Sequence, residues 1–326
     1  MALNLFYAEP DPDRWLAYDR YPRRIIRRLL RGPHLPGGQM RMFLNLCQGL
    51  DRLGIAYRTN DYGYARRHPN ELACIIGKPC VLDRMDWKNP ILFGAAVHSH
   101  PSADPDLLQR RDIRKILVPG EWMRQMCVPV WGDRAFVWPV GIDTAWWSPT
   151  ETAKRHDVLL YVKLRWDQDR VVPTLLDPIR AFLQQKGLDV HEIRYGAYRP
   201  EEYRAALRAS RSMIFLCEHE TQGLAYQEAL SCGVPVFAWD RGGPWTDPEF
   251  YPHRVVYEPV SSVPYWDGRC GMRFCDAEDF AQGFEMFFDA VSRQGFSPRD
   301  YILDNLTLEK CAGHYVEIAR SLGAQV

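Results

Sequence analysis

Short apolar runs alternate with longer amphipathic segments along most of the chain. In the first half, each short run is bounded by polar or turn residues and predicts a buried strand. These runs lie at residues 3–8, 55–59, 72–76, 91–96, 115–118 and 135–138. The segment 38–53 has apolar residues at helical spacing and is followed by Gly54, a stop signal, so we expect a helix there.

The alternation restarts after residues 148–155, a polar and aperiodic segment that we interpret as a linker. Strands are expected at 158–162, 190–194, 212–217 and 234–238, and helices at 174–186, 200–209, 223–231, 277–291 and 307–322. Strands that alternate with helices indicate a parallel sheet covered on both faces. The segment 242–273 is rich in Gly, Pro, Trp and Tyr and predicts no particular element.

Length and charge narrow the class of protein. A chain of 326 residues is long enough for two domains of ordinary size. Its 41 Lys and Arg balance its 41 Asp and Glu, whereas a nucleic-acid-binding protein usually has a basic excess, so nucleic acid is not an expected partner. The N-terminus lacks a signal-peptide pattern and no apolar run reaches the ~18 residues of a membrane span, so we expect a cytoplasmic protein.

The nine cysteines indicate neither a disulfide framework nor a metal site. Their number is odd and no two of them are separated by only two residues. Zinc sites and disulfide frameworks usually show closer or paired spacing. We therefore expect reduced thiols and no bound metal.

The run 215–243 carries most of the chemical information. Its residues indicate a strand, a tight turn, a helix, a glycine, a second strand and a glycine-rich turn. Gly223 lies at the turn into the helix, where the backbone needs a positive φ or a close approach to a ligand. The first helix amides, near Gln222, Gly223 and Leu224, have no intrahelical acceptor, and together with the helix dipole they suit a phosphate group.

Two glutamates frame this turn. Glu220 precedes the helix and Glu228 lies inside it, about two turns in at most. We expect both carboxylates at the carboxyl ends of the strands, where open α/β sheets bind ligands.

With these glutamates, the run resembles the signature of retaining GT-B glycosyltransferases of sequence family 4. That signature has a glutamate, a glycine three places later, a second glutamate after seven residues, and a tail of small residues with Pro-Val. Here these are Glu220, Gly223, Glu228 and residues 231–236. The resemblance implies that Glu228 hydrogen-bonds the donor ribose and that Glu220 contacts the transferred sugar near the reacting carbon.

Other segments resemble the same family and together cover most of the chain. Gly37 and Gly38 resemble its glycine pair, whose amides approach the donor phosphates. Tyr195 resembles part of the loop around the donor base, and His98 a histidine that faces the donor sugar. Residues 118–122, 137–143 and 309–321 are also similar to family segments.

One element departs from the family pattern. The family usually has an arginine after the first strand of the second domain and a lysine five residues later, both on the diphosphate. Here Lys163 stands in the place of the arginine, and the position five residues later is Gln168. A departing diphosphate needs a cation, so Arg165 or Arg170 is the candidate for the second one.

The resemblance implies an α/β protein of the GT-B fold, with two facing Rossmann-like domains, mostly parallel sheets and a deep interdomain cleft. We expect an acceptor-side domain at 1–148 and a donor-binding domain at 149–305, with the helix of 306–326 packing back on the first. The implied function is transfer of a sugar from a nucleotide-diphosphate sugar to a glycan or glycolipid acceptor. Transfer would proceed with retention of configuration and without a metal or other cofactor.

Each of these interpretations has a structural alternative. Glu220 can be a helix-capping carboxylate, Glu228 an exposed helix residue, and His98 a loop histidine bonded to backbone. A helix over 21–31 would carry a basic face opposite an apolar one, suited either to an anionic membrane surface at the inner face of the membrane or to packing on the core. The basic face consists of Arg23, Arg24, Arg27, Arg28 and Arg31.

Two other functions remain open at this point. One is a different GT-B reaction, such as sugar-nucleotide epimerisation or glycerophosphate transfer. The other is a non-catalytic GT-B partner subunit that binds a sugar nucleotide, which only the departures at Lys163 and Gln168 favour. The pattern specifies neither the donor sugar and base, nor the acceptor, nor an oligomeric state.

Overall fold

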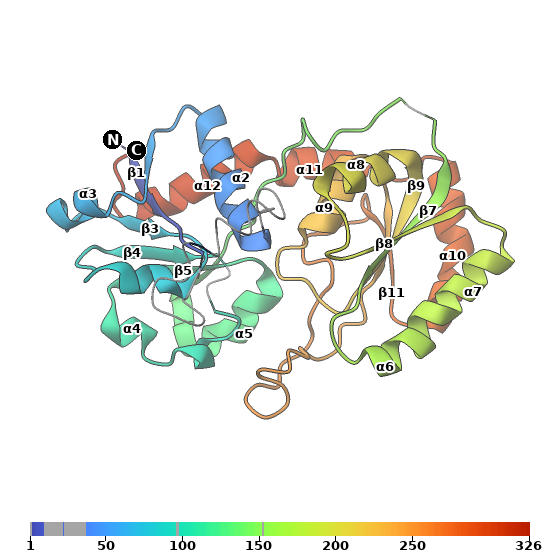
Figure 1. Cartoon of the computed structure of the whole chain (residues 1–326), viewed down its shortest axis with the longest axis horizontal. Helices are drawn as coiled ribbons and strands as arrows, with labels where there is room; N and C mark the ends of the chain where they lie inside the picture. Colours follow the sequence, from blue (N-terminus) through green and yellow to red (C-terminus); the bar gives the residue numbers. More distant parts are fainter. Residues whose placement is uncertain (1, 10–21, 23–36, 96–97, 152) are drawn as a thin grey trace. The chain divides into compact units, whose positions relative to one another are not determined.

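The computed structural model describes residues 2–9, 22, 37–95, 98–151 and 153–326, which form two compact units (Figure 1). The N-terminal unit combines the described residues up to Val118 with Cys127–Trp138 and Ala312–Val326. The C-terminal unit combines Pro119–Met126 with Pro139–Cys311. The five arginines of the expected basic helix lie outside the described residues.

Among the described residues, the N-terminal unit holds a six-stranded sheet of order β2-β1-β3-β4-β5-β6, with neighbouring strands parallel. Every strand expected in this half is present, most with shorter bounds because apolar runs extend past the paired residues. The strands are β1 (Leu3–Phe6), β2 (Tyr57–Thr59), β3 (Ala73–Ile75), β4 (Ile91–Gly94), β5 (Ile113–Val118) and β6 (Ala135–Val137).

The helices of this half connect the strands. The predicted helix of 38–53 is confirmed as α2 (Gly38–Arg52), whose buried face includes Met42, Leu46 and Leu50. The other helical segments are α3 (Tyr62–Arg67), η1 (Pro79–Arg84), η2 (Pro101–Ala103), α4 (Leu107–Arg110), α5 (Glu121–Trp131) and η3 (Gly132–Arg134).

The C-terminal unit has its own parallel sheet of five strands among the described residues, in the order β11-β10-β9-β7-β8. The strands are β7 (His156–Lys163), β8 (Val190–Arg194), β9 (Ser210–Cys217), β10 (Val236–Trp239) and β11 (Gly271–Phe274). The helical segments are α6 (Gln168–Val171), the π-helical η4 (Val172–Leu176), α7 (Asp177–Gln185), α8 (Pro200–Ala209), α9 (Leu224–Ser231), α10 (Ala277–Ser292), α11 (Pro298–Asn305) and α12 (Leu308–Ser321).

Strand β11 lies in the segment for which the sequence predicted no element. It opens on Gly271, whose φ is +138° and where a Cβ would stand 2.0 Å from the carbonyl oxygen of Val236. Only glycine fits this close approach of two backbones. A strand of four residues that begins with glycine has almost no apolar run to reveal it.

The alternation of side chains along β7 places its last residue. Val158, Leu160 and Val162 pack in the core shared with α7 and α10. Leu159 and Tyr161 pack in the core on the other face, with residues of α8 and α9. Because side chains alternate along a strand, Lys163 belongs to the face covered by α8 and α9.

The chain returns to the N-terminal unit through α12, which begins in one unit and ends in the other. Near its start, the backbone around Thr307 and Leu308 runs against Gly141, where a Cβ would stand 2.5 Å from Leu308 Cα. Farther along, the ring of Tyr315 packs 5.0 Å from Trp138 within the N-terminal unit.

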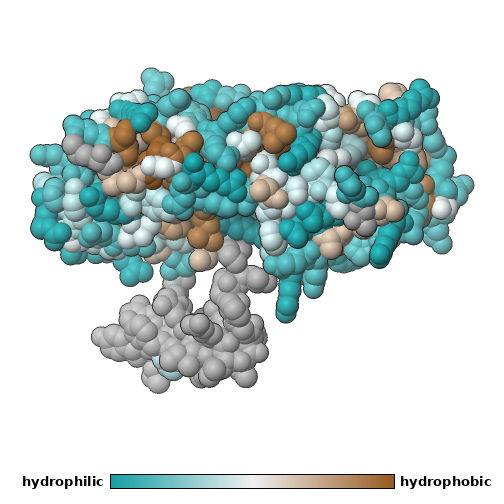
Figure 2. Space-filling model, turned by 90° about the horizontal axis from the view of Figure 1, so that it is seen from above, coloured by the Kyte–Doolittle hydropathy of each residue, from teal (hydrophilic) through white to brown (hydrophobic). Residues whose placement is uncertain are grey.

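Hydrophilic residues cover most of the face shown in Figure 2, and the apolar residues there form small separate groups. In the described part of the chain, no helix combines the length and the apolar character needed to cross a bilayer.

Candidate functional site

A buried ion pair lies at the carboxyl ends of β7 and β9. Lys163 ends β7 and is in register with Cys217, which ends β9. Its Nζ lies 2.5 Å from Glu220 Oε1, and the two side chains are only 12% and 10% exposed. Burial lowers the pKa of the Lys163 ammonium, but the Glu220 carboxylate more than reverses this, so its pKa stands above the ordinary value. The lysine is therefore charged at neutral pH.

This pair is poorly explained by stability alone. Desolvating two charges costs about as much as their attraction returns, so a buried ion pair is weak evidence for a stabilising role. Its position at the strand ends, where open α/β sheets bind ligands, is the better indication of function.

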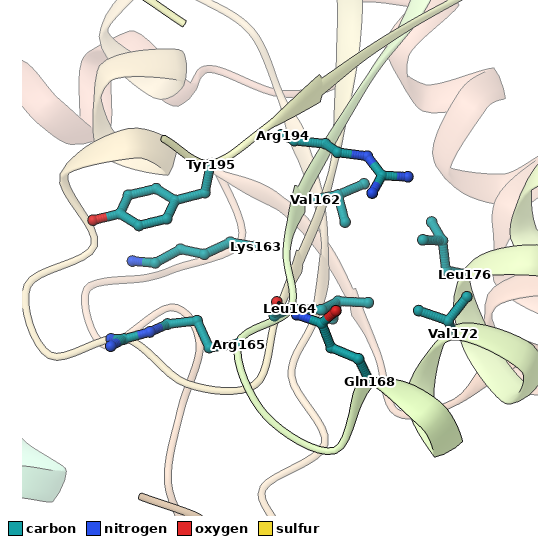
Figure 3. A pocket seen from close by; sticks show the side chains of 9 residues that line it. All are labelled: Val162, Lys163, Leu164, Arg165, Gln168, Val172, Leu176, Arg194 and Tyr195. Carbon is teal, nitrogen blue, oxygen red and sulfur yellow. Dashed lines mark hydrogen bonds between the residues drawn. The ribbon is translucent and has the colours of Figure 1, made fainter. Parts of the chain in front are cut away.

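Tyr195 and Arg165 flank the lysine. Tyr195 follows β8, and its amide donates to the Val162 carbonyl at 2.9 Å. Its ring is 54% exposed and lies 4.5 Å from Lys163 Nζ, a cation–π distance. In Figure 3 the side chains of Lys163, Arg165 and Tyr195 extend to the same side of β7. The strand ends thus present two cations and an exposed aromatic ring together.

A hollow of about 190 Å³ adjoins these residues. In Figure 3 the side chains of Arg194, Val172 and Leu176 lie on the other side of β7 from the Lys163 ammonium. The residues that line the hollow are Val162, Lys163, Leu164, Arg165, Gln168, Val172, Leu176, Arg194 and Tyr195.

Glu218 fixes the turn that carries Arg165. Its Oε1 accepts hydrogen bonds from the backbone amides of Arg165 at 2.7 Å and Trp166 at 3.0 Å. The residue is only 3% exposed, and its Oε2 has no hydrogen-bond partner among the residues that the structure describes. Glu218 was not singled out from the sequence, although it lies two residues before Glu220.

His219 is enclosed by aromatic rings. It stacks on Trp166 at 4.8 Å and 27°, and Trp122 meets it edge-on at 5.6 Å. Burial, followed by the positive charges of Lys163, Arg241 and Arg165, lowers its pKa to about 3. The imidazole is therefore neutral at neutral pH, with one nitrogen as donor and the other as acceptor.

The backbone of Glu220 is held from both sides. Trp122 lies in the segment Pro119–Met126, which the C-terminal unit takes from the first half of the chain. Its indole Nε1 donates to the Glu220 carbonyl at 2.9 Å, and the Glu220 amide donates to Ser261 at 2.9 Å. These bonds orient the carboxylate toward Lys163.

Gly223 sets the start of α9. Its φ is +74°, which confirms the expected left-handed backbone, and a Cβ there would stand 2.1 Å from Tyr226 Cε1. The Tyr226 ring is fixed, because its hydroxyl donates to the Tyr265 carbonyl at 3.0 Å and accepts from the Tyr265 amide at 2.9 Å. The first turn of α9 therefore has room only for glycine at position 223.

Gln222 directly precedes this cap and is 5% exposed. Its backbone carbonyl accepts a hydrogen bond from Gln227 Nε2 at 2.6 Å. Its own side-chain amide has no partner for either Oε1 or Nε2 within the described ranges.

Solved structures of other proteins resemble this chain over nearly its whole length. No protein-family model matches the chain, and no curated protein matches it. AviGT4, a glycosyltransferase involved in avilamycin A biosynthesis, is similar in structure over 99% of this chain and 98% of its own, with a TM-score of 0.57 and 15% identity. The chain has the GT-B fold.

Two other GT-B structures agree with this result. The lipopolysaccharide outer core galactosyltransferase WaaB covers 98% of this chain and all of its own, with a TM-score of 0.53 and 10% identity. Sucrose-phosphate synthase from Thermosynechococcus elongatus covers 90% of this chain and 81% of its own, with a TM-score of 0.52 and 13% identity. At these identities the likeness extends to the fold alone.

The two arginines considered as a second cation for the diphosphate, Arg165 and Arg170, lie in different surroundings. Arg165 lines the hollow next to Lys163. Arg170 instead pairs with Asp167 at 2.5 Å on a largely exposed part of α6. Glu228, at the fifth position of α9, is 5% exposed, so its interpretation as an exposed helix residue was wrong.

The remaining expected site residues belong to the N-terminal unit. His98 follows β4 and is partly buried; burial lowers its pKa, and its Nε2 is without a partner in the described part of the chain. Gly37 caps α2 with an extended backbone, and apart from chain neighbours and the backbone of α2 itself no described atom lies within 4 Å of a Cβ built on Gly37 or Gly38. Among the described residues there is also no group of three or more His, Cys, Asp or Glu side chains placed to hold a metal ion.

Proposed function

We propose that this GT-B protein transfers a sugar from a nucleotide-diphosphate sugar to an acceptor, with retention of configuration and without a metal ion. The observation that carries the proposal is the Lys163–Glu220 pair, held at the carboxyl ends of β7 and β9 next to the start of α9. The fold supports it, because the neighbours named above include a galactosyltransferase and another glycosyltransferase.

The donor diphosphate is assigned to the space between Lys163, Arg165 and the first amides of α9. The helix begins at Leu224, and the amides near Gly223 and Leu224 lie where the helix dipole favours an anion. Arg165 is preferred to Arg170 because the Glu218 carboxylate holds its backbone beside Lys163.

The nucleoside of the donor would extend from this diphosphate site. The exposed ring of Tyr195 offers a surface for the base, next to the lysine that binds the phosphate. Glu228, buried in α9, is the ligand proposed for the ribose. For His98, Gly37 and Gly38, which belong to the N-terminal unit, a contact with the donor stays a prediction from the sequence.

In the reaction, the bond between the anomeric carbon and the diphosphate oxygen breaks, and negative charge develops on the diphosphate. Lys163 and Arg165 neutralise that charge, which is the largest requirement of such a transition state. The acceptor hydroxyl attacks from the face that the diphosphate leaves, and its proton passes to the departing oxygen. The carboxylate of Glu220 stabilises the positive charge on the sugar ring.

A glycan or glycolipid is the proposed acceptor class, and one structural neighbour, WaaB, is a lipopolysaccharide outer core galactosyltransferase. Contact with an anionic membrane surface at its cytoplasmic face, through the arginines of residues 23–31, is part of the same proposal.

The test is product analysis with purified protein, a panel of nucleotide sugars and glycan acceptors. We expect a new glycosidic bond with the anomeric configuration of the donor, seen by NMR, and the same rate with EDTA. Glu220→Gln is expected to lower turnover about 100-fold or more, whereas Glu278→Gln, on the exposed first turn of α10, should not change it. An epimerised donor, a phosphodiester product, or wild-type turnover in Glu220→Gln would refute the proposal.

A further inference from the structure

Two buried polar side chains on either side of Glu220 lack hydrogen-bond partners among the residues that the structure describes. His219 is 8% exposed and Gln222 is 5% exposed. Both ring nitrogens of His219 and both side-chain amide atoms of Gln222 are buried, and none has a hydrogen-bond partner among the described residues. Folded proteins satisfy nearly all buried polar atoms, so four unsatisfied ones within four residues need an explanation.

The surroundings of His219 make the unpaired atoms more costly. Trp166 covers one face of the imidazole, and Trp122 meets it edge-on. These indoles keep bulk water away and offer no acceptor. The nearby cations keep the ring neutral, so it offers one donor and one acceptor rather than a charge.

The chemistry of these atoms matches hydroxyl groups. A hydroxyl donates one hydrogen bond and accepts others, as a neutral imidazole and a carboxamide also do. His219 and Gln222 are themselves uncharged at neutral pH, so they offer hydrogen bonds but no ionic partner to a charged substituent of a sugar. An uncharged, hydroxyl-rich group is the best fit.

We propose that His219 and Gln222 bind the hydroxyl groups of the transferred sugar and so select the donor, which carries an uncharged hexopyranosyl group. This inference rests on the proposed function. Lys163 and Arg165 bind the diphosphate, whereas His219 and Gln222 contact only the glycosyl group. The two parts of the donor are therefore bound by separable sets of side chains.

Apolar replacement of His219 or Gln222 should have opposite effects on stability and on binding. Apolar replacements of similar shape remove the unsatisfied atoms, so the ligand-free protein becomes as stable as wild type or more stable. The same replacements leave sugar hydroxyls without partners in the complex, so the nucleotide sugar binds less tightly. A residue with a purely structural role would show the opposite effect on stability.

The experiment compares Gln222→Met and His219→Phe with wild type by thermal unfolding and by calorimetry. The ligands are the nucleoside diphosphate that binds wild type, chosen among UDP, GDP, ADP, CDP and dTDP, and its glucose, galactose and mannose esters. We expect an unchanged or higher Tm, about tenfold weaker binding of the preferred nucleotide sugar, and diphosphate binding within about twofold of wild type.

Two further variants serve as controls. Gln227→Met removes the donor to the Gln222 carbonyl and is expected to lower the Tm. His219→Asn is smaller than His219→Phe and keeps a donor and an acceptor, so it should retain more nucleotide-sugar affinity than the phenylalanine variant.

The outcomes separate this inference from the proposed function. If wild type binds no nucleoside diphosphate, both fail. If wild type binds one but Gln222→Met and His219→Phe bind its sugar esters as wild type does, only the inference fails. Equal losses of diphosphate and nucleotide-sugar affinity together with a lower Tm would show a structural role and would also overturn it.

Discussion

Replacement of Gly223 by alanine tests whether the start of α9 is as tightly constrained as the structure shows. The backbone at this position has a φ of +74°, where a non-glycine residue costs about 1–2 kcal/mol. The added Cβ would also stand 2.1 Å from Tyr226 Cε1, a contact that requires one of the two groups to move.

Moving the Tyr226 side chain would cost considerable free energy. It is fully buried, and its hydroxyl makes two hydrogen bonds to the backbone of Tyr265. Forcing extra volume into such a core costs about 1–3 kcal/mol. Added to the backbone cost, Gly223→Ala should lower the free energy of unfolding by about 2–5 kcal/mol.

Gly187→Ala is the matched control. Gly187 follows α7 with a φ of +67°, and apart from its two chain neighbours no described residue comes within 4 Å of a Cβ built there. It therefore carries the backbone cost without the collision. By thermal unfolding, we expect a fall in Tm of about 2–6 °C for Gly187→Ala and about 5–15 °C for Gly223→Ala.

Equal losses of stability in the two variants would show that Tyr226 imposes no constraint on position 223. Nucleotide binding gives a second measurement. A displaced Tyr226 disturbs the first turn of α9, so Gly223→Ala should also weaken binding of a nucleoside diphosphate, and Gly187→Ala should not.

The remaining predictions concern single side chains of the site. The pKa of His219 is about 3 in the folded protein, against an ordinary value of 6.5. As the pH falls, the unfolded state therefore takes up a proton before the folded state does. The free energy of unfolding is unaffected by His219 above pH 6.5 and decreases from there toward pH 3. By pH 5 the loss is about 2 kcal/mol, and a pH series of unfolding curves should show a shallower fall for His219→Phe. Glu218→Ala leaves the amides of Arg165 and Trp166 without their acceptor, so urea unfolding should show a free energy of unfolding lower by about 1–3 kcal/mol. Glu218→Gln keeps an acceptor and should lose less. Equal losses in the two variants would contradict this prediction. In calorimetric titrations, Arg165→Ala should bind a nucleoside diphosphate about tenfold more weakly than wild type, and Arg170→Ala should bind it nearly as well as wild type. The reverse order would show that Arg170 is the second cation.

Much of the fold follows from local patterns. The bounds of β8 and α8 agree with the expected 190–194 and 200–209, because Pro200 begins the helix and the strand stands between clear breaks. The run 215–243 also folds as its pattern indicates, with Gly223 at a positive φ. These signals are short-range, because each depends on the types and spacing of neighbouring residues.

The side-chain environment of the site could not be predicted in this way. Lys163 and Glu220 are 57 positions apart, and Trp122 reaches the Glu220 carbonyl across 98 positions. Such contacts depend on which strand ends meet in the sheet. Nothing in the local sequence marks His219 as buried between two indoles, since a histidine beside two glutamates is more typical of an exposed turn.

The proposed function depends above all on Lys163, through which the C-terminal unit would bind the diphosphate of a donor. A diphosphate contact to a charged side chain is worth about 1.5–3 kcal/mol, which corresponds to a change in Kd of about 10–150-fold. The most direct measurement is calorimetric titration of UDP, GDP, ADP, CDP and dTDP, with EDTA present, into wild type, Lys163→Met and Lys163→Arg. We expect one of these nucleotides to bind both wild type and Lys163→Arg, and to bind Lys163→Met at least about tenfold more weakly. Binding to none of them, or equal affinity for wild type and Lys163→Met, would contradict the proposed role of Lys163.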